Sequence, residues 1–133
     1  AVVYGSGKAV IHGVGALAET FSLLGITSAE YFGDVDRAGI QILHAVAEAA
    51  AASEAPPIRP AVAWYEVLVD RRLLVAPLRD DTALEPLSAD AVAWFTAWLG
   101  QPTREVVGEL MQTGFRLPQE LVGWECLSAL LVA

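Results

Sequence analysis

Apolar residues form short runs or recur at helical spacing along the first 66 residues, and glycines separate these segments. Three apolar runs rich in β-branched and aromatic residues predict strands: residues 1–4, 28–32 and 59–64. Apolar residues three and four positions apart predict two helices: residues 16–24 and 37–52. The second would bury Ile40, Leu43, Ala47 and Ala50. Strands that alternate with helices across short turns predict an α/β fold with an open parallel sheet.

The pattern changes after residue 66. A piece that passes from helix to strand is predicted at 67–75, and an irregular, charged segment at 77–86. Three further helices are predicted: 88–100 with Ser88 as N-cap, 102–113 stopped by Gly114, and 121–132. We therefore predict an α/β core over residues 1–66 and a C-terminal extension over 67–133 that packs on it.

Composition indicates a folded chain of one domain's length. The chain has 133 residues, of which 55% are hydrophobic and 18% charged. No stretch approaches the roughly 20 apolar residues of a membrane span. The single cysteine, Cys126, lies in an apolar run and is expected in the core, as are the four tryptophans. The chain begins at Ala1 without a signal pattern, which predicts a fragment of a longer, cytoplasmic protein.

Charge limits the ligands that the chain can bind alone. The net charge is −8, and the eight Lys and Arg residues are scattered along the sequence. Contacts to nucleic-acid phosphates need clustered basic side chains. If DNA is the substrate, metal ions or other parts of a larger assembly would have to offset the acidity.

The most informative segment runs from an apolar strand through Gly33-Asp34-Val35-Asp36 into a helix with Gly39 in its first turn. Ligand sites of parallel sheets lie at the carboxyl ends of the strands. Two carboxylates at i, i+2 point to one side, repel each other and are therefore suited to share a cation. Hard oxygen ligands favour Mg²⁺ or Mn²⁺. Gly33 and Gly39 would allow backbone or phosphate to approach closely.

Other interpretations of this segment remain open. Asp36 would also serve as the N-cap of the following helix, which needs no metal. A calcium loop of the EF-hand type is excluded, because the third acidic position and the twelfth-position Glu are lacking. Phosphatases that form an aspartyl phosphate also begin with a strand and Asp-x-Asp, but Thr or Val usually follows two residues later, where this chain has Ala38.

Three segments resemble one known family. Tyr31-Phe32-Gly33-Asp34-Val35-Asp36-Arg37-Ala38-Gly39-Ile40-Gln41-Ile42-Leu43 resembles the TOPRIM strand-turn-helix of the Wadjet anti-plasmid subunit JetD. It is also similar to the Asp-x-Asp-x-x-Gly segment of the topoisomerase VI A-subunit group. Val2-Val3-Tyr4-Gly5-Ser6-Gly7 resembles the preceding strand and turn. Arg116-Leu117-Pro118-Gln119-Glu120 is similar to the late Arg-Leu-Glu-Gln-Glu motif and departs from it at Pro118.

This resemblance implies a TOPRIM-like domain that cleaves DNA with Mg²⁺ or Mn²⁺ held by Asp34 and Asp36. The family's first-strand Glu would lie upstream of Ala1. The resemblance also implies DNA and the subunits of an SMC-type defence complex as partners, with a homodimer as a further possibility. A catalytically incomplete module that only binds partners or dimerises is the alternative.

Further residues are predicted around the aspartate pair. Glu120 and Gln119 would contribute a supplementary metal or water contact, although Glu120 could equally stabilise a helix start. Lys8, Arg37 and Arg116 are predicted to contact DNA phosphates. His12 and His44 are expected to be surface or packing residues.

Overall fold

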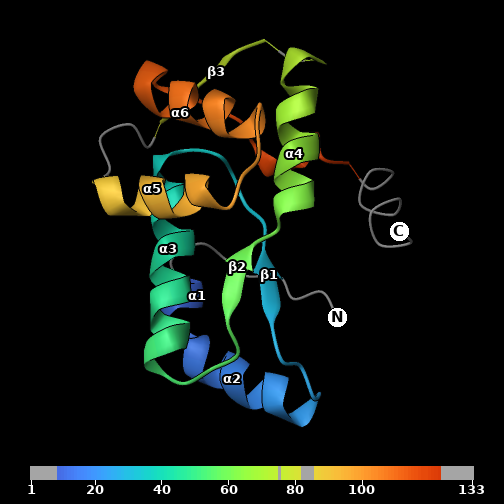
Figure 1. Ribbon diagram of the computed structural model, residues 1–133, viewed down its shortest axis with the longest axis vertical. Coiled ribbons are helices and arrows are strands. Elements are labelled where there is room, and N and C mark those ends of the chain that lie inside the picture. The colour runs from blue at the N-terminus through green and yellow to red at the C-terminus, as the bar shows by residue number, and fades with distance from the viewer. Residues whose placement is uncertain (1–8, 75, 82–85, 124–133) are drawn as a thin grey trace.

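The computed structural model describes residues 9–74, 76–81 and 86–123 (Figure 1). The predicted strand at 1–4, Lys8, Trp124, Cys126 and most of the predicted last helix lie outside the described residues. The elements, in chain order, are α1 (Ala9–His12), α2 (Val14–Leu23), β1 (Ala29–Tyr31), α3 (Arg37–Ala52), β2 (Ile58–Pro60), α4 (Val62–Asp70), η1 (Arg71–Leu74), β3 (Leu78–Arg79), α5 (Ala89–Ala97), α6 (Thr103–Thr113), β4 (Phe115–Arg116) and η2 (Gln119–Leu121).

The described residues form a mixed α/β fold, as the sequence predicts. Strands β1 and β2 pair in parallel, with Ala29 opposite Ile58 and Tyr31 opposite Pro60. The backbone N–H of Ala61 donates to the Tyr31 carbonyl at 2.9 Å and extends this ladder toward the carboxyl ends of both strands. A second pair, β3 with β4, is antiparallel and was not predicted.

Helix α3 is the central element, and its predicted bounds are confirmed. It buries Ile40, Leu43, Val46 and Ala50, so that Val46 replaces Ala47 on the predicted buried face. Position 46, three residues after Leu43, and position 47, four residues after it, both fit a helix of 3.6 residues per turn. The larger side chain, Val46, takes the buried position. Helices α1, α2 and α5 pack against α3, and α4 and α5 both contact α6 (Figure 1).

The predicted strand over residues 59–64 is wrong beyond Pro60. Strand β2 ends there, and α4 begins at Val62. An apolar run cannot distinguish a buried strand from a buried helix by itself. The helix buries Tyr65, Leu68 and Val69, whose spacing of three and four residues begins only where the predicted strand ends.

The predicted elements after residue 66 are confirmed in part. Asp70 ends α4, and a 3₁₀ turn rather than a strand follows it. Ser88 caps α5, because its hydroxyl oxygen accepts from the Ala91 N–H at 3.0 Å. Gly114 stops α6 with a φ of +73°, as predicted. The segment expected to be irregular contains β3.

Two further predictions in this half are wrong. The last helix does not begin at Leu121, because that residue closes the 3₁₀ turn η2 and Val122 is extended. Trp98 is not a core anchor, since it is 43% exposed. Phe95 of α5 and Leu99, which follows the helix, belong to the core cluster, whereas Trp98 between them does not.

One hydrophobic cluster joins both halves of the described chain. It includes Leu43 and Val46 of α3, Tyr65 and Leu68 of α4, and Phe95 of α5. The ring of Tyr65 lies against those of Phe95 and Phe32, with centroids 5.0 and 5.1 Å apart. This packing fixes the carboxyl end of β1 relative to α4. Within the described residues, no helix is long and apolar enough to cross a membrane.

Candidate functional site at the carboxyl end of β1

The loop between β1 and α3 is held by a segment 82 residues further along the chain. Val35 is completely buried and forms an antiparallel bridge with Leu117. Its N–H donates to the Leu117 carbonyl at 2.9 Å, and the reciprocal bond is 3.1 Å long. Asp34 and Asp36 flank this anchored residue. The structure therefore brings the Asp-x-Asp segment and the late Arg-Leu-Pro-Gln-Glu segment together.

Asp36 is the N-cap of α3, as the alternative interpretation predicts. Its Oδ1 accepts a hydrogen bond of 2.6 Å from the Gly39 N–H, and its backbone is extended, as N-cap residues require. The Asp36 side chain is only 5% exposed. Capping thus accounts for one of its two carboxylate oxygens.

Asp34 is not explained by capping of α3. Its Oδ1 accepts a hydrogen bond of 2.8 Å from the backbone N–H of Gln119, at the start of η2. The side chain remains 34% exposed. Gln119 therefore belongs to the site through its backbone and fixes the orientation of the Asp34 carboxylate.

Arg116 is the common neighbour of both aspartates. Its Nη1 lies 3.9 Å from Asp34 Oδ2 and 4.0 Å from Asp36 Oδ2. Each carboxylate thus uses one oxygen for a backbone amide and has the other within 4.0 Å of the same Arg116 nitrogen. The prediction that the i, i+2 spacing points both side chains to one side agrees with this geometry.

Two further aspartates at the site were not predicted. Asp80 is buried, and its Oδ2 accepts from the Arg37 N–H at 3.2 Å, which adds a second cap to the first turn of α3. Asp81 is exposed and lies 3.7 Å from Arg116 Nε. Asp80 and Asp81 follow β3 directly, so recognising the β3–β4 pair would have placed them beside Arg116.

The electrostatics of the loop disfavour a further negative charge. Burial, and then the charges of Asp34 and Asp80, raise the pKa of the Asp36 carboxyl, while the Gly39 N–H and Arg116 oppose this rise. Burial and the two loop aspartates also raise the pKa of the Tyr31 hydroxyl. The site is therefore a cluster of acidic side chains in which Arg116 lies close to both loop carboxylates.

Gly39 lies against the loop backbone, whereas Gly33 lies against a side chain. A Cβ added at Gly39 would overlap the carbonyl oxygen of Asp34 and come within 3.1 Å of Asp36 Oδ1. A Cβ at Gly33 would lie 3.0 Å from the Tyr31 ring. The Gly33 N–H also donates to the buried Tyr65 hydroxyl at 3.1 Å. Gly39 therefore lets α3 begin against the loop.

The other predicted residues lie as follows. Arg37 opens α3 and contacts Asp80 through its backbone. Glu120 is exposed in η2, next to Gln119. His44 packs against Trp94, with ring centroids 5.2 Å apart, and lies 3.7 Å from Glu48, as expected of a packing residue.

The donor set of the site fits a magnesium ion bound by few protein ligands. Mg²⁺ in proteins often takes one or two carboxylates and completes its shell with water and substrate phosphate. Asp34 and Asp36 each have one carboxylate oxygen within 4.0 Å of Arg116 Nη1. Among the described residues, no group of three or more His, Cys, Asp or Glu side chains is arranged to hold a metal.

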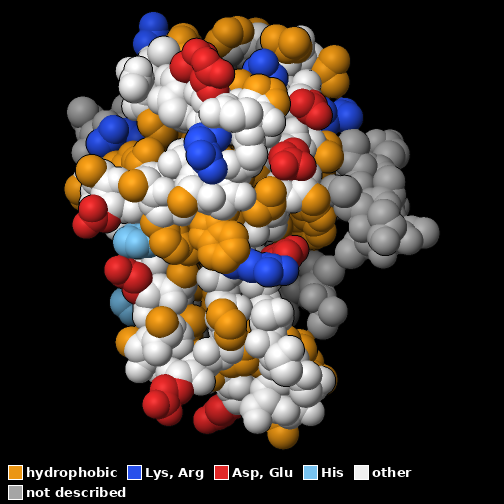
Figure 2. Space-filling model, viewed as in Figure 1, with side chains coloured by type: hydrophobic (Ala, Val, Ile, Leu, Met, Phe, Trp, Pro, Cys, Tyr) orange, Lys and Arg blue, Asp and Glu red, His pale blue; other side chains and the backbone are white. Residues whose placement is uncertain are grey.

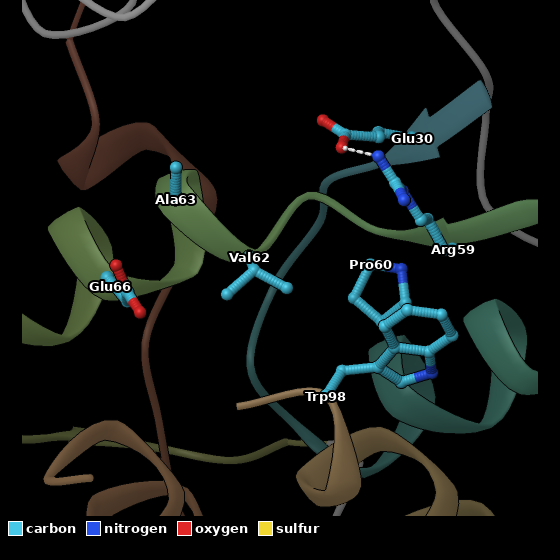
Figure 3. Close-up of a pocket in the computed structure, with 7 residues that line it drawn as sticks. All are labelled: Glu30, Arg59, Pro60, Val62, Ala63, Glu66 and Trp98. Carbon is cyan, nitrogen blue, oxygen red and sulfur yellow. Dashed lines mark hydrogen bonds and ion pairs between the residues drawn. The ribbon is translucent and has the colours of Figure 1, made fainter. Parts of the chain in front are cut away.

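A hollow of about 370 Å³ lies elsewhere on the surface, at the start of α4 (Figure 3). The Trp98 indole lies beside Pro60, and Glu66 enters from α4. At its rim, Arg59 Nη2 donates to Glu30 Oε1 at 3.0 Å. None of its lining residues belongs to the aspartate site. The guanidinium of Arg59 is already paired with Glu30, so the hollow offers a ligand no unpaired charge from Arg59.

The basic residues do not form one patch on the face shown in Figure 2, where Lys and Arg are interspersed with Asp and Glu. No family model, curated protein or solved structure matches the chain. What the chain does is therefore inferred from the geometry of the aspartate site.

Proposed function

We propose that the chain is a TOPRIM-like domain that cleaves DNA with Mg²⁺ or Mn²⁺ held by Asp34 and Asp36. The carrying observation is that Asp34 Oδ2 and Asp36 Oδ2 both lie within 4.0 Å of one nitrogen, at the carboxyl end of β1. Capping explains only Asp36, whereas Asp34 is oriented by the late motif. Two of the three segments that carry the resemblance, the Asp-x-Asp segment and the late Arg-Leu-Pro-Gln-Glu segment, lie together, which supports the JetD-like assignment.

The residues around the aspartate pair would then each have a role in metal or DNA binding. The backbone N–H groups of Gly39 and Gln119 hold one oxygen of each aspartate and leave the other for the cation. A bound cation would polarise the scissile phosphate and lower the pKa of a coordinated water. Arg116, whose side chain is 29% exposed, would contact a phosphate beside the pair. The exposed Glu120 remains a predicted supplementary contact.

The acidity of the chain is consistent with delivery of DNA by other subunits. With a net charge of −8 and dispersed arginines, the domain would repel DNA at a distance. We propose that a partner complex of the SMC type presents the DNA, so that this domain contributes cleavage rather than affinity.

The test combines metal binding with cleavage. Isothermal titration with MgCl₂ and nicking of supercoiled plasmid are compared for the wild type, Asp34→Asn and Asp90→Asn. Asp90 is an exposed aspartate at the start of α5 and serves as the matched control. We expect Asp34→Asn to lose at least about tenfold in metal affinity, and cleavage with it, while Asp90→Asn behaves as the wild type. Metal binding unaffected by Asp34→Asn would refute the proposed ligand set.

A second candidate, an interaction or dimerisation module, is favoured by exposed leucines. Leu73, Leu74 and Leu78 are 80%, 70% and 40% exposed. With Ala76 and Pro77, Leu73 and Leu78 line a hollow of about 350 Å³. Sedimentation of the wild type and of Leu73→Gln/Leu74→Gln separates the candidates. A dimer that dissociates in the double variant, without metal binding, supports the interaction module; a monomeric wild type counts against it.

A further inference from the structure

Arg116 lies next to both loop aspartates. Its backbone is fixed on both sides, because Arg116 pairs with Leu78 in the β3–β4 sheet and Leu117 bridges Val35. Only the side chain is therefore free to change position. Its Nη1 lies 3.9 and 4.0 Å from the two Oδ2 atoms, longer than a hydrogen bond.

The guanidinium is electrostatically paired but poorly bonded. Its Nε is buried without a hydrogen-bond partner, and Oδ1 of the exposed Asp81 lies 3.7 Å away from it. A buried donor without an acceptor costs free energy. The charge of Arg116 thus compensates the aspartates without the short, bidentate bonds that make an arginine–carboxylate pair strong.

The side chain also has space to leave. Arg116 lines the hollow of about 350 Å³, whose other lining residues include Leu73 of η1, Leu110 of α6 and Phe115 of β4. A guanidinium that turned into this hollow or toward solvent would vacate the point between the aspartates. The backbone bonds of Gly39 and Gln119 would keep both carboxylates in place meanwhile.

We infer that Arg116 is the resident countercharge of the Asp34–Asp36 pair and that a divalent cation competes with it for the site. This inference rests on the proposed metal-binding function. A dication bound at the pair and the nearby guanidinium would repel each other, so metal binding displaces Arg116. The displaced guanidinium is then available for an anionic ligand such as a phosphodiester. Arg116 acts in this scheme as a positioning residue and sets how readily the site accepts metal.

The experiment measures MgCl₂ affinity by titration calorimetry and thermal unfolding with and without MgCl₂. The variants are Arg116→Gln, Arg116→Lys and the matched control Arg79→Gln. Arg79 lies on the neighbouring strand over the Phe115 ring, so its replacement removes the same charge from the same small sheet. We expect Arg116→Gln to bind Mg²⁺ about tenfold tighter or more, with Arg116→Lys and Arg79→Gln close to the wild type. Without metal, Arg116→Gln should melt below the wild type, and MgCl₂ should close that gap.

The outcomes separate this inference from the proposed function. If the wild type binds Mg²⁺ and Arg116→Gln binds it equally or more weakly, the countercharge role is refuted and the metal site stands. If neither protein binds Mg²⁺, both proposals fail. Binding by Arg116→Gln alone supports the inference, because the arginine then blocks the site.

A measurement on the wild type covers the case in which Arg116→Gln does not fold. The Nε–Hε resonance of Arg116 in a nitrogen-15 spectrum should shift on addition of MgCl₂, whereas that of Arg79 should not. An unchanged Arg116 resonance at saturating Mg²⁺ would show that the metal does not displace it.

Discussion

Gly39→Ala tests how closely α3 is built against the loop that carries the aspartates. In the interior of a helix, replacing Gly by Ala usually stabilises by about 1 kcal/mol. At Gly39 the added Cβ would overlap the Asp34 carbonyl oxygen and crowd Asp36 Oδ1 at 3.1 Å. The first turn of α3 would have to move away from the loop.

The expected magnitude follows from three contributions. Overpacking costs about 1–3 kcal/mol, and loss of the Asp36–Gly39 cap costs about 1 kcal/mol. The helical preference of Ala returns about 1 kcal/mol. We therefore expect Gly39→Ala to lower the free energy of unfolding by about 1–3 kcal/mol.

The assay is urea unfolding followed by circular dichroism, with Gly108→Ala as the matched control. Gly108 lies inside α6, and a Cβ there would meet nothing within 4 Å. This control should stabilise the chain by about 1 kcal/mol. If Gly39→Ala stabilised the chain as Gly108→Ala does, the close approach of α3 to the Asp34 carbonyl would be refuted.

Three further substitutions test the capping, core and electrostatic interpretations. Ser88→Ala removes the cap of α5 and should cost about 1 kcal/mol in urea unfolding, while Ser22→Ala, exposed in α2, should cost much less. Leu43→Ala, at a completely buried position of α3, should cost about 2–5 kcal/mol by the same assay, and a loss under 1 kcal/mol would contradict its place in the core. Burial raises the pKa of the Asp36 carboxyl above its ordinary value of 3.8 in the folded chain. The stability gained from the protonated carboxyl is therefore fully present below pH 3.8 and is lost as the pH rises through the pKa of the folded state. Asp36→Asn should therefore decline less in stability than the wild type as the pH rises from below 3.8, in unfolding curves at a series of pH values; equal declines would argue against the raised pKa.

The elements that sequence predicts well are those with a strong local signal. Helix α3 has sixteen residues with apolar periodicity and a capping aspartate before them, and its predicted bounds match the structure. Ser88 and Gly114 also act locally, the first by a side-chain cap and the second by its left-handed backbone. The strand predicted over residues 62–64 was wrong because a short apolar run carries no periodicity of its own.

The site could be predicted only in part, because half of it comes from distant segments. The aspartate pair and the cap were visible in the loop sequence. The contacts of Arg116 and Gln119 with the pair depend on the Val35–Leu117 bridge, which no local pattern reveals. Asp80 and Asp81 follow a strand of two residues, too short for alternation of apolar and polar positions to be detected.

Anomalous diffraction from crystals of the chain soaked in MnCl₂ shows directly whether Asp34 and Asp36 bind a divalent cation. We expect a manganese peak at the carboxylates of Asp34 and Asp36, with the Arg116 guanidinium moved away from them. A well-ordered aspartate site without manganese, or manganese bound only at other carboxylates, would refute the proposed metal site.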